Sequence, residues 1–155
     1  MGARTRPWLI AAAVIAVDQG TKILVERSMP GGGAIALLGG AAHIVHVRNA
    51  GSAFGIFRTA TIPMLVSALV VTWWLVANLT GTMRGSGRVF ETGSSVMVGG
   101  ALGNLIDRVR AGCVVDFVDF HFWPVFNLAD TAIAVGALLV VYAMVLGKTR
   151  GRSSE

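Results

Sequence analysis

Two acidic residues in the second half of the chain, Asp116 and Asp130, could together activate water. The stretch between them, "FVDFHFWPVFNLA", contains Pro124 in an aromatic-rich turn that can fold one acid back toward the other. Two carboxylates in one poorly solvated site cannot both ionise, so they share a proton. The ionised member can take a proton from water while the protonated member donates to a carbonyl oxygen. The pair therefore predicts hydrolysis that requires neither a metal nor a cofactor.

Further polar residues stand close to these acids within apolar sequence. Asn127 precedes Asp130 by three residues, which predicts that both lie on one helical face. Asn104, Asp107 and Arg108 are related by three and four residues on another apolar segment. An ionised side chain in hydrocarbon costs at least about 2.5 to 3.5 kcal/mol, so we expect the two polar faces to turn toward each other. They predict a polar pocket.

Other reactive residues offer weaker patterns. Cys113 could act as a nucleophile with His121 as its base, but nothing in the sequence orients this pair. His43 and His46 have no third ligand at metal spacing, so we expect them on a strand face and predict no metal site. Because Cys113 is the only cysteine, it cannot form an intramolecular disulfide.

The composition indicates a membrane protein. Of the 155 residues, 54% are hydrophobic and only 14% are charged, against about 25% in soluble domains. The net charge of +5 could indicate a nucleic-acid partner, but the basic residues form no dense cluster with interleaved aromatics, so we expect none. The chain is predicted to be a single integral membrane domain over residues 1–155.

Four apolar segments are long enough, or nearly so, to cross a bilayer core of about 30 Å. They cover residues 8–25, 62–79, 90–106 and 125–146. A helix from residue 125 would put Asp130 five residues below its outer end, or roughly 7 Å. The first segment also resembles a secretory signal peptide, but a charged "DQGTK" follows it instead of a small-residue cleavage site, so we expect a mature helix. The predicted fold class is an all-α membrane protein with four transmembrane helices.

The basic residues predict the topology. Seven of the thirteen lie before the first segment, between the second and third, and after the fourth, where only two acids accompany them. By the positive-inside rule, these three regions and both termini are cytoplasmic. Residues 26–60 and 107–124 then face outward. Within them "AHIVHVRN" alternates like a strand, which predicts a small extracytoplasmic β-structure. We expect the aromatic residues Phe117, Phe120, Phe122 and Trp123 to lie at the membrane interface.

Some polar and glycine motifs have structural interpretations. Asp18 and Lys22 stand four residues apart in the favourable order for a helical ion pair. Asp107 and Arg108 could likewise pair to stabilise the fold. The "GGALG" motif at 99–103 contains a GxxxG pattern, which typically allows close helix packing.

Taken together, the motifs resemble those of the lipoprotein signal peptidases, also called signal peptidase II. Five blocks match in order: "DQGTK" at 18–22, "NAGSAFG" at 49–55, "GGALGNLIDR" at 99–108, "GCVVDF" at 112–117 and "FNLAD" at 126–130. The resemblance implies an aspartyl endopeptidase of the bacterial cytoplasmic membrane. It would cleave prolipoproteins on the amino side of a diacylglyceryl-modified cysteine, with its site near the outer leaflet.

The resemblance also assigns residues. Asp116 and Asp130 fall on the catalytic pair of the family. The positions that would bind substrate or support the site are Asp18, Lys22, Asn49, Gly51, Asn104, Asp107, Arg108 and Asn127. Membrane lipid and the lipid-modified precursor would be the partners of a protein that we expect to be monomeric. The alternatives from other classes are a small proton-coupled transporter or channel, since intramembrane acids and lysines often mark ion paths, and a structural membrane adaptor.

Overall fold

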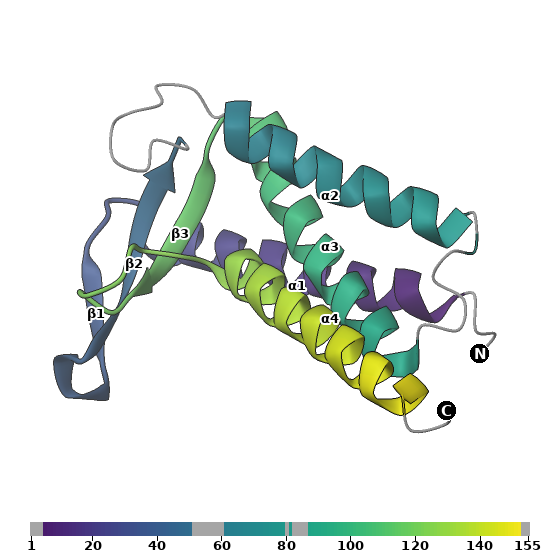
Figure 1. Ribbon diagram of the computed structural model, residues 1–155. Helices are drawn as coiled ribbons and strands as arrows, with labels where there is room; N and C mark the ends of the chain where they lie inside the picture. Colours follow the sequence, from purple (N-terminus) through teal and green to yellow (C-terminus); the bar gives the residue numbers. More distant parts are fainter. Residues whose placement is uncertain (1–4, 51–60, 80, 82–86, 153–155) are drawn as a thin grey trace.

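The computed structural model describes residues 5–50, 61–79, 81 and 87–152, which form a helical bundle with a small sheet at one end (Figure 1). The start of α1 and the end of α4 lie at the end of the bundle remote from the sheet. The elements in chain order are α1 (Arg6–Ser28), β1 (Ala34–Leu37), the 3-10 turn η1 (Leu38–Gly40), β2 (Ala42–Asn49), α2 (Thr61–Leu79), α3 (Gly87–Ala111), β3 (Val114–Asp119) and α4 (Leu128–Arg152).

Each of the four predicted apolar segments forms a helix, with differences at the ends. Helix α3 is longer than the predicted 90–106 at both ends. Helix α4 begins at Leu128, and not at Val125 as predicted, because Val125 and Phe126 remain extended and Phe126 pairs with Val118. Asp130 therefore lies in the first turn of α4, which corrects the prediction that it stands five residues into the helix.

Two of the described helical stretches, Arg6–Ser28 and Leu128–Val145, are long and apolar enough to cross a membrane, and Leu65–Asn78 is a shorter apolar stretch. Large aliphatic side chains are exposed on these helices. Leu24, Leu69 and Leu138 are 65%, 68% and 70% exposed. Exposed apolar surface on this scale is typical of a lipid-facing helix. The number of spans remains a prediction.

Helix α3 is the central helix, and its glycines set how closely its neighbours approach. A Cβ on Gly99 would lie 2.9 Å from the carbonyl oxygen of Ala11 on α1. On the α4 side, a Cβ on Gly93 would lie 2.9 Å from the carbonyl oxygen of Gly136. Since real Cβ atoms do not approach backbone this closely, the glycines are required for the packing. The prediction that "GGALG" mediates helix packing is confirmed.

The sheet is antiparallel with the strand order β1-β2-β3. Strand β2 covers the "AHIVHVRN" segment that was predicted to be a strand, whereas β1 and β3 were not predicted. An apolar cluster of Val25 from α1, Met29 just after that helix and Phe117 from β3 fixes the sheet to the bundle. This attachment places β3 beside the helix ends that carry the polar residues (Figure 1).

The aromatic residues of the 117–123 segment divide into two groups. Phe117 is only 8% exposed and belongs to the core cluster, so its predicted place at the interface is wrong. Phe122 and Trp123 are 83% and 62% exposed and remain free to contact a membrane surface. His121, directly before Phe122, has a φ of 66°. This left-handed backbone conformation turns the chain back toward α4.

Candidate active site

Asn127 and Asp130 form a reciprocal cap at the start of α4. The backbone N–H of Asp130 donates to Oδ1 of Asn127 over 3.0 Å, and the backbone N–H of Asn127 donates to Oδ2 of Asp130 over 3.2 Å. This is the capping-box arrangement, with aspartate as the acidic member. Asn127 is therefore the residue before the helix, and the predicted common helical face is wrong. Both side chains are nevertheless held together.

Asn127 also connects Asp130 to Asp116. Its Nδ2 donates to Oδ1 of Asp116 over 2.7 Å, and Nδ2 of Asn49 at the end of β2 donates to the other oxygen, Oδ2, over 2.8 Å. Asn127 is fully buried, and Asp116 is 3% exposed. The structure thus brings the two predicted acids, from a strand and a helix, to one residue: Asp116 accepts from the side chain of Asn127 and Asp130 from its backbone N–H, although the acids are fourteen positions apart.

The surroundings of Asp116 act on its acidity in opposite directions. Burial raises the pKa of Asp116 above its ordinary value, and the nearby carboxylate of Asp130 raises it further. The hydrogen bonds that Asn49 and Asn127 donate lower the same pKa, because they stabilise the ionised form. Burial is the largest of these effects, so this acid keeps its proton to a higher pH than an exposed aspartate does.

Asn104 from α3 reaches the second acid. Its Nδ2 donates to Oδ1 of Asp130 over 2.8 Å, and its Oδ1 accepts from Nζ of Lys22 over 2.9 Å and from Nδ2 of Asn127 over 3.2 Å. Asn104 is 3% exposed. Both oxygens of Asp130 therefore accept hydrogen bonds from fixed donors.

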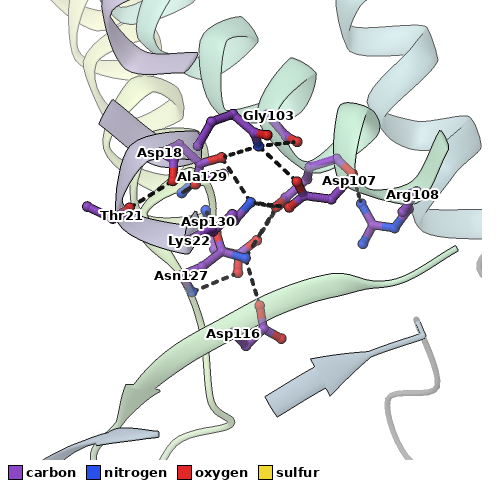
Figure 2. Close-up of polar contacts among 12 residues, drawn as sticks. Asp18, Thr21, Lys22, Gly103, Asp107, Arg108, Asp116, Asn127, Ala129 and Asp130 are labelled. Carbon is purple, nitrogen blue, oxygen red and sulfur yellow. Dashed lines mark hydrogen bonds and ion pairs between the residues drawn. The ribbon is translucent and has the colours of Figure 1, made fainter. Parts of the chain in front are cut away.

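Asp18 and Lys22 on α1 contact the groups that hold Asp130 in place. The predicted ion pair exists, with 2.9 Å between Lys22 Nζ and Asp18 Oδ2. Oδ1 of Asp18 accepts from the backbone N–H of Ala129 over 3.0 Å, so Asp18 binds the first turn of α4 directly (Figure 2). A negative charge is stabilised at this end of a helix. Asp18 thereby fixes the turn that carries Asp130.

Asp107 completes the contacts of Lys22. Its Oδ2 lies 2.6 Å from Lys22 Nζ, and its Oδ1 accepts from Nε2 of Gln19 over 2.8 Å. Asp107 thus forms its ion pair with Lys22, whereas its interaction with the neighbouring Arg108 is electrostatic only. Gln19 was missed as a site residue, although it stands inside the "DQGTK" motif.

Arg108 lies on the open side of the network. Its Nη1 donates to the backbone carbonyl of Asn104 over 3.3 Å, and its guanidinium interacts electrostatically with Asp130 and Asp116. Its Nε is buried and has no hydrogen-bond partner among the described residues. A donor without a partner beside two carboxylates is suited to holding an oxygen of a bound molecule.

Other predicted or considered residues lie elsewhere. Asp119 is on β3, where it accepts from the backbone N–H of His121 over 2.7 Å, and this hydrogen bond lowers its pKa. The ring of His121 stacks on His43 of β2 with 4.5 Å between ring centroids. Within the described part of the chain, no three His, Cys, Asp or Glu side chains are grouped as metal ligands. Gly51 lies outside the described residues.

Comparison with known proteins agrees with the motifs. The sequence profile described as signal peptidase (SPase) II matches residues 10–146 of the chain. The chain belongs to the signal peptidase II family. A lipoprotein signal peptidase of Nitratidesulfovibrio vulgaris is 41% identical over 143 residues, which cover 87% of this chain and 86% of that protein. The lipoprotein signal peptidase of Halothermothrix orenii is also 41% identical, with 86% and 91% covered.

Solved structures extend the likeness to the fold. A bacterial membrane enzyme determined by the in meso method has a TM-score of 0.79 and 27% sequence identity, and the match covers 94% of this chain and 90% of that one. A second bacterial membrane enzyme has a TM-score of 0.78 with 29% identity. This signal peptidase II family member is accordingly a bacterial membrane peptidase with the fold of these enzymes.

Proposed function

We propose that the protein is an aspartic endopeptidase that removes signal peptides from prolipoproteins, cleaving on the amino side of a diacylglyceryl-modified cysteine. Membership in the signal peptidase II family supports the substrate class. The observation that carries the mechanism is the hydrogen bonding of Asn127 to both Asp116 and Asp130. Two acids held by one residue, Asp116 buried and Asp130 half-buried, can share a proton and act on one water molecule.

The reaction follows from one ionised and one protonated carboxyl group. The ionised acid takes a proton from water while the water oxygen bonds to the scissile carbonyl carbon. The protonated acid donates its proton to the carbonyl oxygen. Collapse of the tetrahedral intermediate breaks the carbon–nitrogen bond, and a carboxyl group gives a proton to the leaving amine. The products are the signal peptide, with a new carboxylate, and the lipid-modified cysteine, with a free amino group.

The surroundings of the two acids divide these roles. Asp130 lies in the first turn of α4, where the helix dipole favours a negative charge. Asp116 lies on a strand, and its burial raises its pKa. We therefore assign the water-activating carboxylate to Asp130 and the proton-donating acid to Asp116.

Asn49 and Arg108 are the groups best suited to hold the substrate backbone. Asn49 comes from the end of β2 and donates to Asp116, and Arg108 comes from α3 and interacts electrostatically with both acids. The unpartnered Nε of Arg108 can donate to a peptide carbonyl. Such contacts hold the scissile bond at the water and reduce the entropy loss in the transition state.

The membrane placement belongs to the same proposal. All four helices cross the cytoplasmic membrane, both termini are cytoplasmic, and the acids lie near the outer leaflet beside the sheet. The diacylglyceryl group of the substrate then stays among lipids while the peptide bond reaches the acids. Reporter fusions at Gly32 and at the C-terminus should report opposite sides of the membrane, and reports from one side would overturn this topology.

The direct experiment is cleavage by the purified protein in detergent. A prolipoprotein carrying the diacylglyceryl group should be converted to its mature form, and the same precursor without the lipid should remain uncut. The matched precursors isolate the lipid as the determinant. Equal cleavage of both, or of neither, would contradict the proposed specificity.

A further inference from the structure

Lys22 is a buried cation whose bonding capacity is used completely. It is 2% exposed, and its Nζ lies 2.9 Å from Asp18 Oδ2, 2.6 Å from Asp107 Oδ2 and 2.9 Å from Asn104 Oδ1. An ammonium group has three donors and no acceptor. Two of its contacts neutralise carboxylates, but the third is to a neutral amide, which ion pairing alone does not require.

The contact to Asn104 decides which way that amide points. Lys22 can only donate, so the oxygen of Asn104 must face it, and Nδ2 of Asn127 donates to the same oxygen. The NH2 group of Asn104 is thereby directed to Oδ1 of Asp130, 2.8 Å away. A flipped amide would place its NH2 group against the ammonium and its oxygen against the carboxylate. Lys22 therefore acts on Asp130 without touching it.

We propose that Lys22 is a positioning residue of the proposed peptidase reaction: it orients Asn104 so that Asp130 is held as an ionised, water-accepting carboxylate. This inference rests on the proposed function and assigns a particular task to one buried lysine. The ion pairs with Asp18 and Asp107 make the burial of the lysine tolerable, and the amide contact links it to the reacting acids.

The charge of Lys22 also bears on protonation of the pair. Among the described residues, the cations that act on the pair are Lys22 from α1 and Arg108 from α3, and the neighbouring acids Asp18 and Asp107 pair with Lys22. Removal of Lys22 leaves Arg108 as the cation among them. A second proton then binds the singly ionised pair more readily. The pH profile of cleavage should move to higher pH, which simple loss of folded protein would not cause.

The test is Lys22→Met in the full-length protein, which keeps an unbranched apolar side chain and removes the donor. Since small displacements of catalytic groups cost up to about 100-fold in rate, we expect kcat to fall by roughly 10- to 100-fold with KM changed only a few-fold. We also expect the profile to move to higher pH. Arg48→Met is the control, because it removes an exposed cation whose partner is Glu26, and its profile should not move.

A charge-balanced variant separates positioning from stability. Lys22→Met combined with Asp107→Asn removes one charge of each sign, so its thermal unfolding should return toward that of the parent. Because the Asn104 oxygen still lacks the ammonium group and keeps only the 3.2 Å hydrogen bond from Asn127, kcat should stay low. Recovery of kcat together with stability, or an unmoved pH profile in Lys22→Met, would overturn the positioning role. If the parent failed to cleave the lipid-modified precursor, or Asp130→Asn remained active, the proposed function itself would fail.

Discussion

The two ends of the α3–α4 contact are built on different principles. Away from the sheet, Gly93 and Gly136 bring the two backbones together. Beside the sheet, the side-chain amides of Asn104 and Asn127 link the same helices through hydrogen bonds to each other and to the acids. One region holds the helices by close packing, and the other holds them by hydrogen bonds.

This difference indicates how stability and chemistry are divided. Close packing of glycine-rich faces gains dispersion energy and requires no burial of charge. Buried carboxylates lose hydration, and their pairing often does no more than offset that loss. A network built from Asp18, Lys22, Asp107, Asp116 and Asp130 is therefore a poor way to stabilise a fold. We expect changes there to affect catalysis first, and changes at the glycines to affect folding first.

The largest effect on activity is expected from Asp130→Asn. The amide keeps the size of the side chain but cannot accept the proton of water, so kcat should fall by roughly 1,000-fold or more, as removal of a catalytic base does. Cleavage of the lipid-modified precursor and thermal unfolding would both be measured. Asp119→Asn is the matched control and should retain activity, because Asp119 bonds to His121 on the sheet. A large loss of thermal stability in Asp130→Asn would contradict the assignment of catalysis to this region and stability to the glycine-packed region.

Gly93→Val tests the packed region. A Cβ there would lie 2.7 Å from Cβ of Leu139 and 2.9 Å from the carbonyl oxygen of Gly136, so the two helices would have to separate. Overpacking of this kind costs about 1–3 kcal/mol or more, measured as a lower thermal unfolding midpoint in detergent. Gly20→Ala is the control, since none of the described residues packed around Gly20 has an atom within 4 Å of its added Cβ. Equal stability of Gly93→Val and the parent would argue against the close approach.

Sequence patterns located the helices and β2 because these elements carry local signals. A charge-free run such as Thr61–Leu79 has few alternatives to a helix, and alternating β-branched residues in Ala42–Asn49 favour a strand. The four-residue β1 carries no such signal, since its order depends on pairing with β2. Strand β3 was missed because Phe117 within it was interpreted as part of an aromatic loop at the membrane interface.

The sequence predicted most residues of the site but fewer of the contacts between them. The acids and amides are recognisable because polar residues in apolar sequence require partners. Which partner each takes depends on tertiary packing: Asp107 meets Lys22 on another helix, and Asp18 reaches the backbone of Ala129. Spacing rules for a single helix cannot predict such contacts. The start of α4 was misplaced for a related reason, since its cap uses the same two residues as the site.

A moderate effect on pH dependence is expected from Asn49→Ala. The hydrogen bond from Asn49 lowers the pKa of Asp116, so its removal should raise that pKa. If Asp116 must donate a proton, the alkaline limb of the cleavage profile should move up by about one pH unit, as expected for loss of one hydrogen bond to a charged group. Cleavage rates across pH would measure it. A shift to lower pH would contradict the assignment of the proton to Asp116.

The smallest effect is expected from Cys113→Ala. In the proposed mechanism this thiol takes no part, so turnover should stay within a few-fold of the parent, and thiol-blocking reagents should not inhibit. Chelators should likewise leave cleavage intact, because the described residues offer no group of three metal ligands. Complete loss of activity in Cys113→Ala would revive a cysteine mechanism with His121.

The central claim is that Asp116 and Asp130 act as one unit on one water molecule. The most direct measurement compares kcat for the lipid-modified precursor in Asp116→Asn, Asp130→Asn and the double variant, all shown to be folded and inserted. Residues that act in a single step are strongly non-additive, so the double variant should be scarcely slower than the slower single variant. Near-normal cleavage by either single variant, or a double loss equal to the product of two independent losses, would contradict the paired mechanism.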